Sequence, residues 1–399
     1  MNFELTDEQE MLREAAIDAL GRHPSLAAAR EAADGAERLD LWPVAVEAGW
    51  CGLLVSEERG GAGLGLFDAM LVLEQCGRTL ASTGLVGHLA GTLVLERAAE
   101  RGDDDAADAA ARAASGEARV ATLFAAPPLG EGAWTIAGAD PAAGPKQVPI
   151  RDSGAISGEA GFVPDAPGSD LLVVPALGEG DELGAYLVDA DDPGVAIDAF
   201  TRFDHTRPLA HVRLGGASSI SLDATAADLA DAWNFAQAML AAEAIGVSDA
   251  VREMAVEYSR DRHAFGRPIG SYQAVKHQLV EMLRAAATAR SLTYYAGLSA
   301  DGGGEDLGRA AGTLRFAAER ASDFSTRTCI AVHGGIGVTW EHDAPLYLRR
   351  SQLSRLLLGG ERGAADRVAD EVIAAARRRR REQQEAGMAS NATNGGTST

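Results

Sequence analysis

Residues 260–279 read RDRHAFGRPIGSYQAVKHQL, and residues 332–350 read VHGGIGVTWEHDAPLYLRR. The first stretch follows a long segment with helical periodicity and carries the Gly and Pro residues of a turn. The second is a glycine-rich loop between two helical segments. Each pattern alone is common, but their order and spacing within a long helical half of the chain are distinctive. The pair therefore decides between fold classes.

In the first stretch, Arg262 and Phe265 lie three residues apart near the expected end of a helix, with Pro268 beyond. Arginine is a planar cation with several donors, which suits a phosphate or pyrophosphate. An aromatic ring nearby can cover the edge of a flat ring system. Gln273 can form hydrogen bonds through both ends of its amide. These residue types suit either a ligand site or a structural turn.

The second stretch contains His333 followed by a glycine-rich segment, HGGIG. Glycines such as Gly334 and Gly335 let backbone N–H groups approach an anion closely. We expect His333 to pack or form hydrogen bonds, because no second histidine or carboxylate stands at metal-ligand spacing beside it. The sequence therefore predicts no metal site here. The chain also contains no G-x-S-x-G, P-loop or H-E-x-x-H motif.

The composition is that of a globular protein of 399 residues, 46% of them apolar. No apolar run is long enough for a membrane helix, and the acidic start does not resemble a signal peptide. Three widely spaced cysteines, Cys51, Cys76 and Cys329, favour a reducing cytoplasm over a disulfide framework. The net charge of −22 disfavours nucleic acid and anionic membranes as partners. The basic run Arg377–Arg381 indicates either a solvated helix end or a phosphate contact.

The pattern of apolar residues changes along the chain. Residues 1–120 show helical periodicity, as in DEQEMLREAAIDAL, with turns near the GGAGLG cluster. Residues 121–220 contain six or seven short apolar runs between Gly, Pro and Asp, such as DLLVVPAL and AYLVDA. These runs predict a small β-barrel or sandwich domain. No helical segments alternate with them, so a Rossmann-type parallel sheet is excluded.

Residues 221–381 are again helical and predict a helical bundle. Thr225 and Asp228 form a capping box that starts a helix running to Tyr258. The polar tail 382–399, rich in Ser, Thr, Asn and Gly, is expected to be disordered.

Together, R-x-x-F-G-x-P-I-x-x-x-Q-x-x-x-H and H-G-G-x-G-x-x-x-E resemble the motifs of the acyl-CoA dehydrogenase family. The resemblance covers residues 3 to about 375 and includes WPVAVEAGWCGLLVSEERGGAGLG near the start and FDHTRPLAHVRL in the middle. It implies an α+β fold with an N-terminal α-helical domain, a middle β-domain and a C-terminal four-helix bundle.

The resemblance also implies a cofactor, FAD, bound between the β-domain, the bundle and a neighbouring subunit. Arg262, Phe265 and Gln273 would hold its adenosine pyrophosphate part across a subunit interface, and Gly334 and Gly335 would meet the same FAD through backbone groups. The implied substrate is an acyl-CoA thioester, and electron-transfer flavoprotein or a similar protein would accept the electrons. In the family reaction, a carboxylate removes the α-proton while a hydride leaves the β-carbon for flavin N5.

The sequence departs from the family at the carboxylate. The usual catalytic glutamate falls on Leu358, and the alternative position, on the first helix after the β-domain, falls on Ala236. Gln237 follows where an arginine is common in relatives. Neither Leu358 nor Ala236 can take a proton.

The β-domain departs as well. The family's flavin-facing loop corresponds here to APPLGEG at residues 126–132. The aromatic that packs on the flavin corresponds to Phe162, and Pro164 stands where a threonine often donates to the isoalloxazine. Proline has no N–H and no hydroxyl, so this donor is missing.

Two nearby carboxylates are alternative bases. Glu243 lies seven residues after Ala236 on the same expected helix, a translation of roughly 10 Å. Glu361 follows Leu358 by three residues and is expected near the start of a helix. A relocated base at Glu243 would allow the chain to act as a homo-oligomer.

The missing carboxylate is also compatible with a division of roles between two different subunits. Some family members form α2β2 hetero-oligomers in which one subunit carries the glutamate and the other completes the FAD site. A chain with the bundle motifs and without the base matches such a subunit. A purely structural or regulatory subunit, or a tailoring enzyme that acts on carrier-protein-bound acyl chains, are further alternatives.

Overall fold

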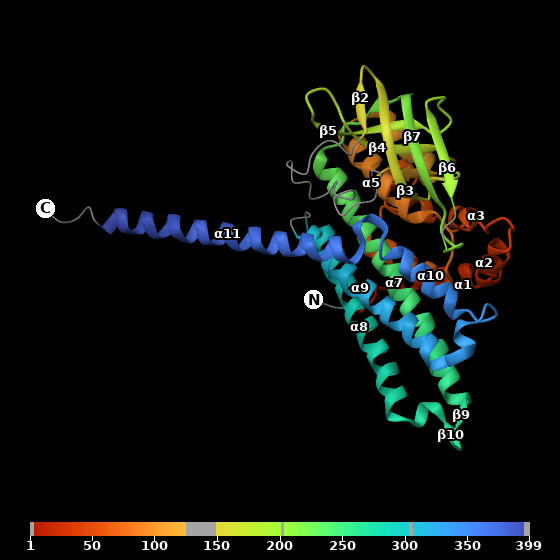
Figure 1. Cartoon of the computed structure of the whole chain (residues 1–399). Coiled ribbons are helices and arrows are strands. Elements are labelled where there is room, and N and C mark those ends of the chain that lie inside the picture. The colour runs from red at the N-terminus through yellow and green to blue at the C-terminus, as the bar shows by residue number, and fades with distance from the viewer. Residues whose placement is uncertain (1–3, 125–148, 201–202, 303–305, 395–399) are drawn as a thin grey trace.

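The computed structural model describes residues 4–124, 149–200, 203–302 and 306–394. Helices are followed by strands and then by helices again (Figure 1). The β-sheet lies at one end with the N-terminal helices beside it, and the long helix α7 (Ala226–Asp261) runs from there to the opposite end of the molecule (Figure 1). This confirms the expected sequence of a helical domain, a β-domain and a helical bundle.

The N-terminal region consists of helices with an apolar face, and several of them begin at a polar capping residue. The Thr6 hydroxyl accepts the Gln9 N–H and the Gln9 side chain accepts the Thr6 N–H, both at 3.2 Å, which starts the first helix. The elements are α1 (Asp7–Gly21), α2 (Ser25–Ala33), α3 (Trp42–Glu47), η1 (Trp50–Gly52), η2 (Glu57–Arg59), α4 (Leu66–Thr79), α5 (Leu85–Glu100) and α6 (Asp104–Ala114).

In the described residues, the middle region forms one sheet in the order β6-β7-β3-β2-β4-β5-β8, with β1 pairing in parallel with β4. Strand β4 is buried along its whole length. Its alternate side chains serve two cores: Val173 faces the large core shared with the helices, and Leu172 and Val174 face a smaller core within the β-domain. The strands are β1 (Val120–Thr122), β2 (Ile150–Asp152), β3 (Ala155–Pro164), β4 (Leu171–Leu177), β5 (Leu183–Asp189), β6 (Val195–Phe200), β7 (Leu209–Ser218) and β8 (Ile220–Ser221).

The C-terminal region begins with the predicted capping box. The Thr225 hydroxyl accepts the Asp228 N–H at 3.2 Å, and the Asp228 carboxylate accepts the Thr225 N–H at 2.7 Å. Helix α7 ends at Asp261, three residues beyond the expected Tyr258. The other elements are β9 (His263–Ala264), β10 (Arg267–Pro268), η4 (Ile269–Ser271), α8 (Gln273–Asp301), α9 (Leu307–His333), η5 (Gly334–Val338), α10 (Ala344–Ser354), η6 (Leu357–Gly359) and α11 (Gly360–Asn394).

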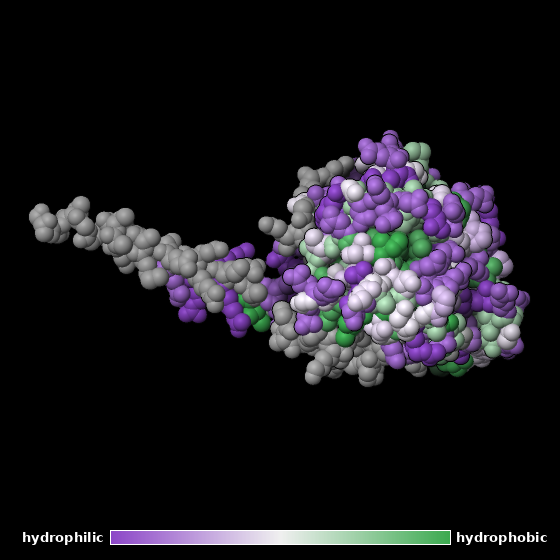
Figure 2. All heavy atoms as spheres, turned by 90° about the horizontal axis from the view of Figure 1, so that it is seen from above, coloured by the Kyte–Doolittle hydropathy of each residue, from purple (hydrophilic) through white to green (hydrophobic). Residues whose placement is uncertain are grey.

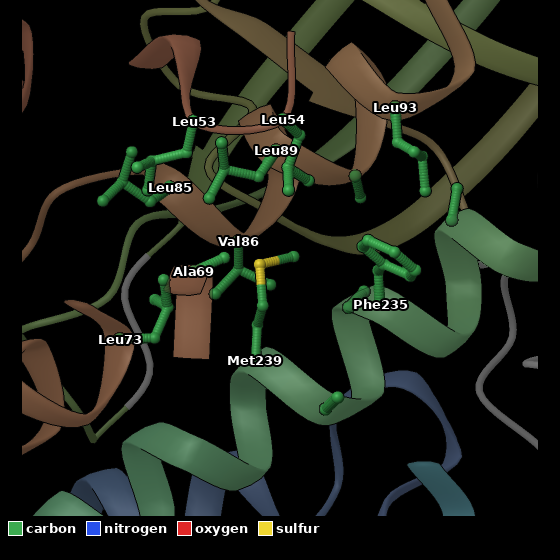
Figure 3. Packing of buried hydrophobic residues seen from close by; sticks show 14 of the residues in the cluster. Leu53, Leu54, Ala69, Leu73, Leu85, Val86, Leu89, Leu93, Phe235 and Met239 are labelled. Carbon is green, nitrogen blue, oxygen red and sulfur yellow. The ribbon is translucent and has the colours of Figure 1, made fainter. Parts of the chain in front are cut away.

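The largest core lies where α4, α5 and α7 meet. Phe235 and Met239 of α7 pack with Val86 and other apolar residues of α5 (Figure 3). Helices α4 and α7 approach so closely that a Cβ on Gly77 would stand 2.0 Å from the Glu243 backbone oxygen. Only glycine allows this contact, which fixes the position of Glu243 along α7 relative to α4.

Helix α11 leaves the body of the molecule and projects outward (Figures 1 and 2). It continues to Asn394, so the prediction of disorder from residue 382 onwards is wrong for residues 382–394. The segment REQQEAGMA consists mostly of residues with good helix propensity, and these extend the preceding helix despite its polar character. No helix in the described part of the chain is both long and apolar enough to cross a membrane.

Candidate functional site

Helix α7 connects two groups of predicted site residues. Ala236 lies near its start, and Arg262 is its C-terminal cap. At about 1.5 Å per residue, the helix separates them by roughly 39 Å. The predicted base position and the first predicted FAD-binding motif therefore lie toward different ends of α7.

The segment after α7 folds into a hairpin with Phe265 and Gly266 at its tip. Ala264 of β9 pairs with Arg267 of β10. Both tip residues have positive φ, 53° for Phe265 and 80° for Gly266, as a type I′ turn requires. The Phe265 side chain is 97% exposed. A bulky residue in this backbone region, with its ring in solvent, favours a contact with a group outside this chain.

Arg262 and Gln273 flank the hairpin with exposed side chains. The Arg262 backbone is fixed, because its N–H donates to Tyr258 O at 2.9 Å and its oxygen accepts the Ile269 N–H at 2.8 Å. Within the residues that the structure describes, the Arg262 guanidinium makes no ion pair. A fixed backbone with an unpaired cation suits the binding of an anion.

The glycine-rich loop lies against the same end of α7. The His333 ring stacks on Tyr258 with centroids 4.3 Å apart. Gly334 and Gly335 are exposed, and a Cβ on either would meet nothing within 4 Å. Because Tyr258 is one turn before Arg262, the structure brings the two predicted motifs together. Among the described residues, no group of three or more His, Cys, Asp or Glu is placed to hold a metal ion.

A groove runs along α9 from this loop to the turn between α10 and α11. It consists of two adjoining hollows of about 450 and 780 Å³, which share Arg355 and Glu361. Ala331 lines one hollow, and Phe203 and Leu356 line the other. Phe203 is 46% and Leu356 66% exposed, so apolar surface is open in a hollow of ligand size.

The two usual positions of the catalytic carboxylate are closed. Ala236 and Leu358 are each 1% exposed, and Gln237 is fully buried. The Gln237 amide Nε2 donates to Leu358 O at 2.8 Å. The guanidinium of Arg315, on α9, donates to Ser354 O at 2.5 Å and so also holds the turn between α10 and α11. The space between the two positions is therefore filled by the protein's own side chains.

Glu243 belongs to a buried ion-pair network. Its carboxylate pairs with Arg207 and lies 3.7 Å from Arg350, and all three side chains are at most 5% exposed. Arg350 also binds the Asp204 carboxylate at 3.0 Å. The Glu243 carboxylate already contacts two guanidinium groups, so it would have to break an ion pair before it could abstract a proton. The arrangement favours a structural role for this residue.

Glu361 is the more accessible of the two carboxylates. It lines both hollows of the groove, with its side chain 16% exposed. It pairs with Arg355 at 2.7 Å and with Arg320 at 3.4 Å. A reacting carbon in the groove would lie nearer to Glu361 than to the buried Glu243.

The flavin-facing positions expected in the β-domain are only partly visible. Residues 126–132 lie outside the described residues. Phe162 has φ 54° and its ring lies 5.1 Å from that of Phe200. Pro164 pairs with Leu209 at the end of β3. The structure thus places the Phe162 ring in an aromatic cluster and leaves position 164 without a donor.

Sequence reasoning missed the buried arginines. Arg315 and Glu319 form an ion pair at 2.8 Å with no exposed surface, and burial raises the pKa of Glu319 to about 7. Arg207 and Arg350 are 5% and 2% exposed. One signal was available, since Arg315 and Glu319 stand four residues apart between apolar positions of a helix. Burial of Arg207 and Arg350 depends on contacts that sequence spacing does not show.

The chain matches the sequence profile of the acyl-CoA dehydrogenase N-terminal domain over residues 6–116. It matches that of the acyl-CoA dehydrogenase C-terminal domain over residues 227–362. These matches leave most of the β-domain between them and include both motifs that we predict to bind FAD.

Two similar proteins match this chain over nearly their whole length. Acyl-CoA dehydrogenase IpdE2 of Mycobacterium tuberculosis is 30% identical over 369 residues, covering 92% of this chain and 98% of that protein. Its namesake from Mycolicibacterium smegmatis is 29% identical over 372 residues, covering 92% and 100%. These relatives match from one end to the other, not through a single shared domain.

Among solved structures, the steroid ACAD Tcur3481-Tcur3483 superimposes with a TM-score of 0.82 at 26% identity, covering 93% of this chain and 99% of that chain. The ChsE4-ChsE5 complex of Mycobacterium tuberculosis gives a TM-score of 0.79 at 23% identity, covering 94% and 99%, and supports the fold. Profile, full-length relatives and fold agree with the paired motifs at the end of α7. The chain belongs to the acyl-CoA dehydrogenase family of FAD-dependent oxidoreductases.

Proposed function

We propose that this chain takes part in the α,β-dehydrogenation of an acyl-CoA thioester as the subunit that completes an FAD site, while a paralogous partner supplies the catalytic carboxylate. One observation carries the proposal. The FAD motifs are exposed and unpaired at the end of α7, whereas Ala236 and Leu358 are buried and tied together by Gln237.

The residues present fit one half of FAD. The unpaired Arg262 guanidinium can bind a pyrophosphate, the exposed Phe265 ring can cover a flat base, and Gln273 can donate or accept. The open backbone at Gly334 and Gly335 lets N–H groups reach an anion without a Cβ in the way. Bound FAD would supply the acceptor for the hydride from the substrate β-carbon.

The hetero-oligomer rests on the missing base and on the similar structures. Removal of the α-proton needs a carboxylate within hydrogen-bond reach of the α-carbon, and both usual positions lack one. Two similar structures are each named for a pair of proteins, and one of these pairs is described as a steroid ACAD. We therefore propose an α2β2 assembly, an acyl group from steroid or fatty-acid β-oxidation, and reoxidation by electron-transfer flavoprotein or a similar acceptor. Three buried free cysteines suit a cytoplasmic location.

The second candidate is a self-sufficient homo-oligomer with a relocated base. Glu243 is the base that we proposed from the sequence, and it would have to leave Arg207 to act. A tailoring enzyme for carrier-bound acyl chains is a variant of this candidate that differs only in its substrate.

The test is an anaerobic visible-absorbance titration of the purified chain with a panel of acyl-CoAs and carrier-linked acyl chains. We expect no bleaching of the oxidised flavin band for the chain alone, and bleaching once a co-expressed glutamate-bearing paralogue is added. Bleaching by the chain alone would establish the homo-oligomer, and its loss in Glu243→Gln but not in Glu361→Gln would identify the base. Bleaching only by carrier-linked chains would indicate the tailoring enzyme.

A further inference from the structure

Residues 339–343 join the glycine-rich loop η5 to the start of α10. The Thr339 N–H and hydroxyl donate to Ile336 O at 3.1 and 3.0 Å, and the His342 N–H donates to Thr339 O at 3.3 Å. His342 lies outside both predicted FAD motifs. These bonds nevertheless connect it to the loop that we propose to bind FAD.

The His342 ring also packs against this loop through His333. The centroids of the two rings are 4.3 Å apart, and the His333 ring stacks on Tyr258 of α7. The His333 Nδ1–H donates to Cys329 O at 2.8 Å, which fixes the ring on α9. A Cβ on Gly337 would stand 2.8 Å from the His333 Cβ, so the loop lies closely against this side chain. The position of the loop therefore depends on how the two histidine rings pack.

His342 also caps the start of α10. Its Nδ1 accepts the Ala344 N–H at 3.1 Å, which requires an unprotonated Nδ1. The N-cap residue Asp343 makes no side-chain bond to the helix, and its carboxylate pairs with Arg30 of α2. Arg30 also donates to Trp340 O at 3.0 Å, so its guanidinium lies beside the segment. The neutral His342 ring thus binds a backbone N–H that the Asp343 side chain leaves free.

The groups around His342 favour its neutral form. Burial lowers the pKa of His342 below its ordinary value of 6.5, and the neighbouring His333 ring and Arg30 guanidinium lower it further. A proton on Nδ1 would also face the Ala344 N–H and the positive end of the α10 dipole. The Asp343 carboxylate acts in the opposite direction, but it is already paired with Arg30. A protonated His342 would therefore have to turn away from the start of α10.

We propose that neutral His342 is a positioning residue for flavin binding, which holds the glycine-rich loop in the form that receives FAD, and that its protonation loosens this loop. The inference rests on the proposed function. Bound FAD keeps His342 neutral, whereas in the loosened loop the ring regains its ordinary pKa of 6.5. FAD binding should therefore be strongest above this value and weaken as the pH falls through it. From about pH 7.5 to about pH 5.5, one proton accounts for a loss of up to about tenfold in affinity.

The test measures the dissociation constant of FAD between about pH 7.5 and about pH 5.5, on the chain alone or on its complex with the glutamate-bearing paralogue, whichever binds the flavin. We expect the wild type to lose affinity by up to about tenfold, reversibly and with unchanged far-UV circular dichroism. His342→Asn should change by less than about twofold across this range, because its amide oxygen can accept the Ala344 N–H but does not titrate. His23→Asn, the same change at a partly exposed histidine between α1 and α2, should keep the wild-type loss.

A variant without any acceptor separates positioning from charge. His342→Leu should bind FAD more weakly than His342→Asn at both pH values, because the Ala344 N–H then has no side-chain partner. Equal acid losses in wild type and His342→Asn would assign the loss to another group and overturn the inference. A wild-type affinity that does not change with pH would also overturn it, while the proposed FAD site would stand. If neither the chain nor the complex binds FAD at about pH 7.5, the proposed function and this inference are both wrong.

Discussion

Arg262 leaves the end of α7 with a fixed backbone and an exposed guanidinium. Arg262→Ala should weaken FAD binding roughly 10–150-fold, because a charge-assisted contact contributes about 1.5–3 kcal/mol. Arg260→Ala is the matched control, since Arg260 is also exposed but lies on another side of the helix. The amount of flavin that each variant retains after ultrafiltration measures its FAD binding. Equal losses in the two variants would contradict the role given to Arg262.

The buried network gives a second prediction for a single side chain. Glu243→Gln should lower the free energy of unfolding by about 3–5 kcal/mol, because Arg207 would keep its buried charge without a carboxylate partner and Arg350 would keep only Asp204. Glu253→Gln, on the same helix but in an exposed pair with Arg78, should cost at most about 1 kcal/mol. Urea unfolding distinguishes them. A small effect of Glu243→Gln would reopen the possibility that this residue is free to act as a base.

Single residues also show how far the sequence can be interpreted. Arg262, Phe265 and Gln273 could be proposed as FAD-binding residues because the family motif has a fixed spacing along a short turn, and the same holds for the glycines after His333. The contact between Gln237 and Leu358 joins residues 121 positions apart. The sequence showed that a carboxylate was missing, but only the packing of α7 against the α10–α11 turn shows that its place is closed.

Between elements, His88 joins α5, β1 and the turn η1. Its Nδ1 accepts the Val120 N–H at 3.1 Å, and its Nε2–H donates to Cys51 O at 3.0 Å. Both nitrogens are thus used in the neutral form, and burial lowers the pKa of His88 to about 3. Below pH 6.5 the unfolded chain binds a proton that the folded chain does not, so stability decreases as the pH falls toward 3.

The matched variant is His88→Gln, which does not titrate. The unfolding free energy of the wild type should exceed that of the variant at about pH 7.5. This excess should shrink by about 1.4 kcal/mol per pH unit between pH 6 and pH 4. Chemical unfolding across this pH range provides the measurement, and parallel curves for the two proteins would show that His88 does not remain neutral.

Elements were predicted best where local chemistry defines them. The Thr225–Asp228 box started α7 at the expected residue, and the short apolar run that includes Leu172 and Val173 identified a strand. The hairpin at Phe265 was predicted only as a turn, because its strands have two residues each and leave no periodic signal. Helix α11 was cut short because Ser, Asn and Gly outweighed the helix formers before them in the composition.

For the molecule as a whole, the packing of α11 predicts where the domain ends. Ala364 and Val368 lie against Gly312 of α9, and Glu371 lies against Gly308. Removal of residues 377–399 should change the free energy of unfolding by less than about 1 kcal/mol, since Arg377, Arg379, Arg380 and Gln384 are exposed. Ala364→Asp should cost about 3–5 kcal/mol by placing a charge in the interface. Strong destabilisation by the truncation would show that the projection packs on another part of the protein.

The hairpin of β9 and β10, with Phe265 at its tip, lies at the end of the bundle remote from the sheet (Figure 1). If the Phe265 ring and Arg262 grip a cofactor whose reacting end lies in a neighbouring subunit, then this chain contributes to a site that it cannot fill alone. Retention of the flavin then obeys mass action. Dilution that separates the subunits would release the flavin, and an excess of flavin would favour association of the subunits. The amount of flavin bound in a preparation would then depend on the protein concentration and on the presence of the partner subunit, even when every molecule is correctly folded.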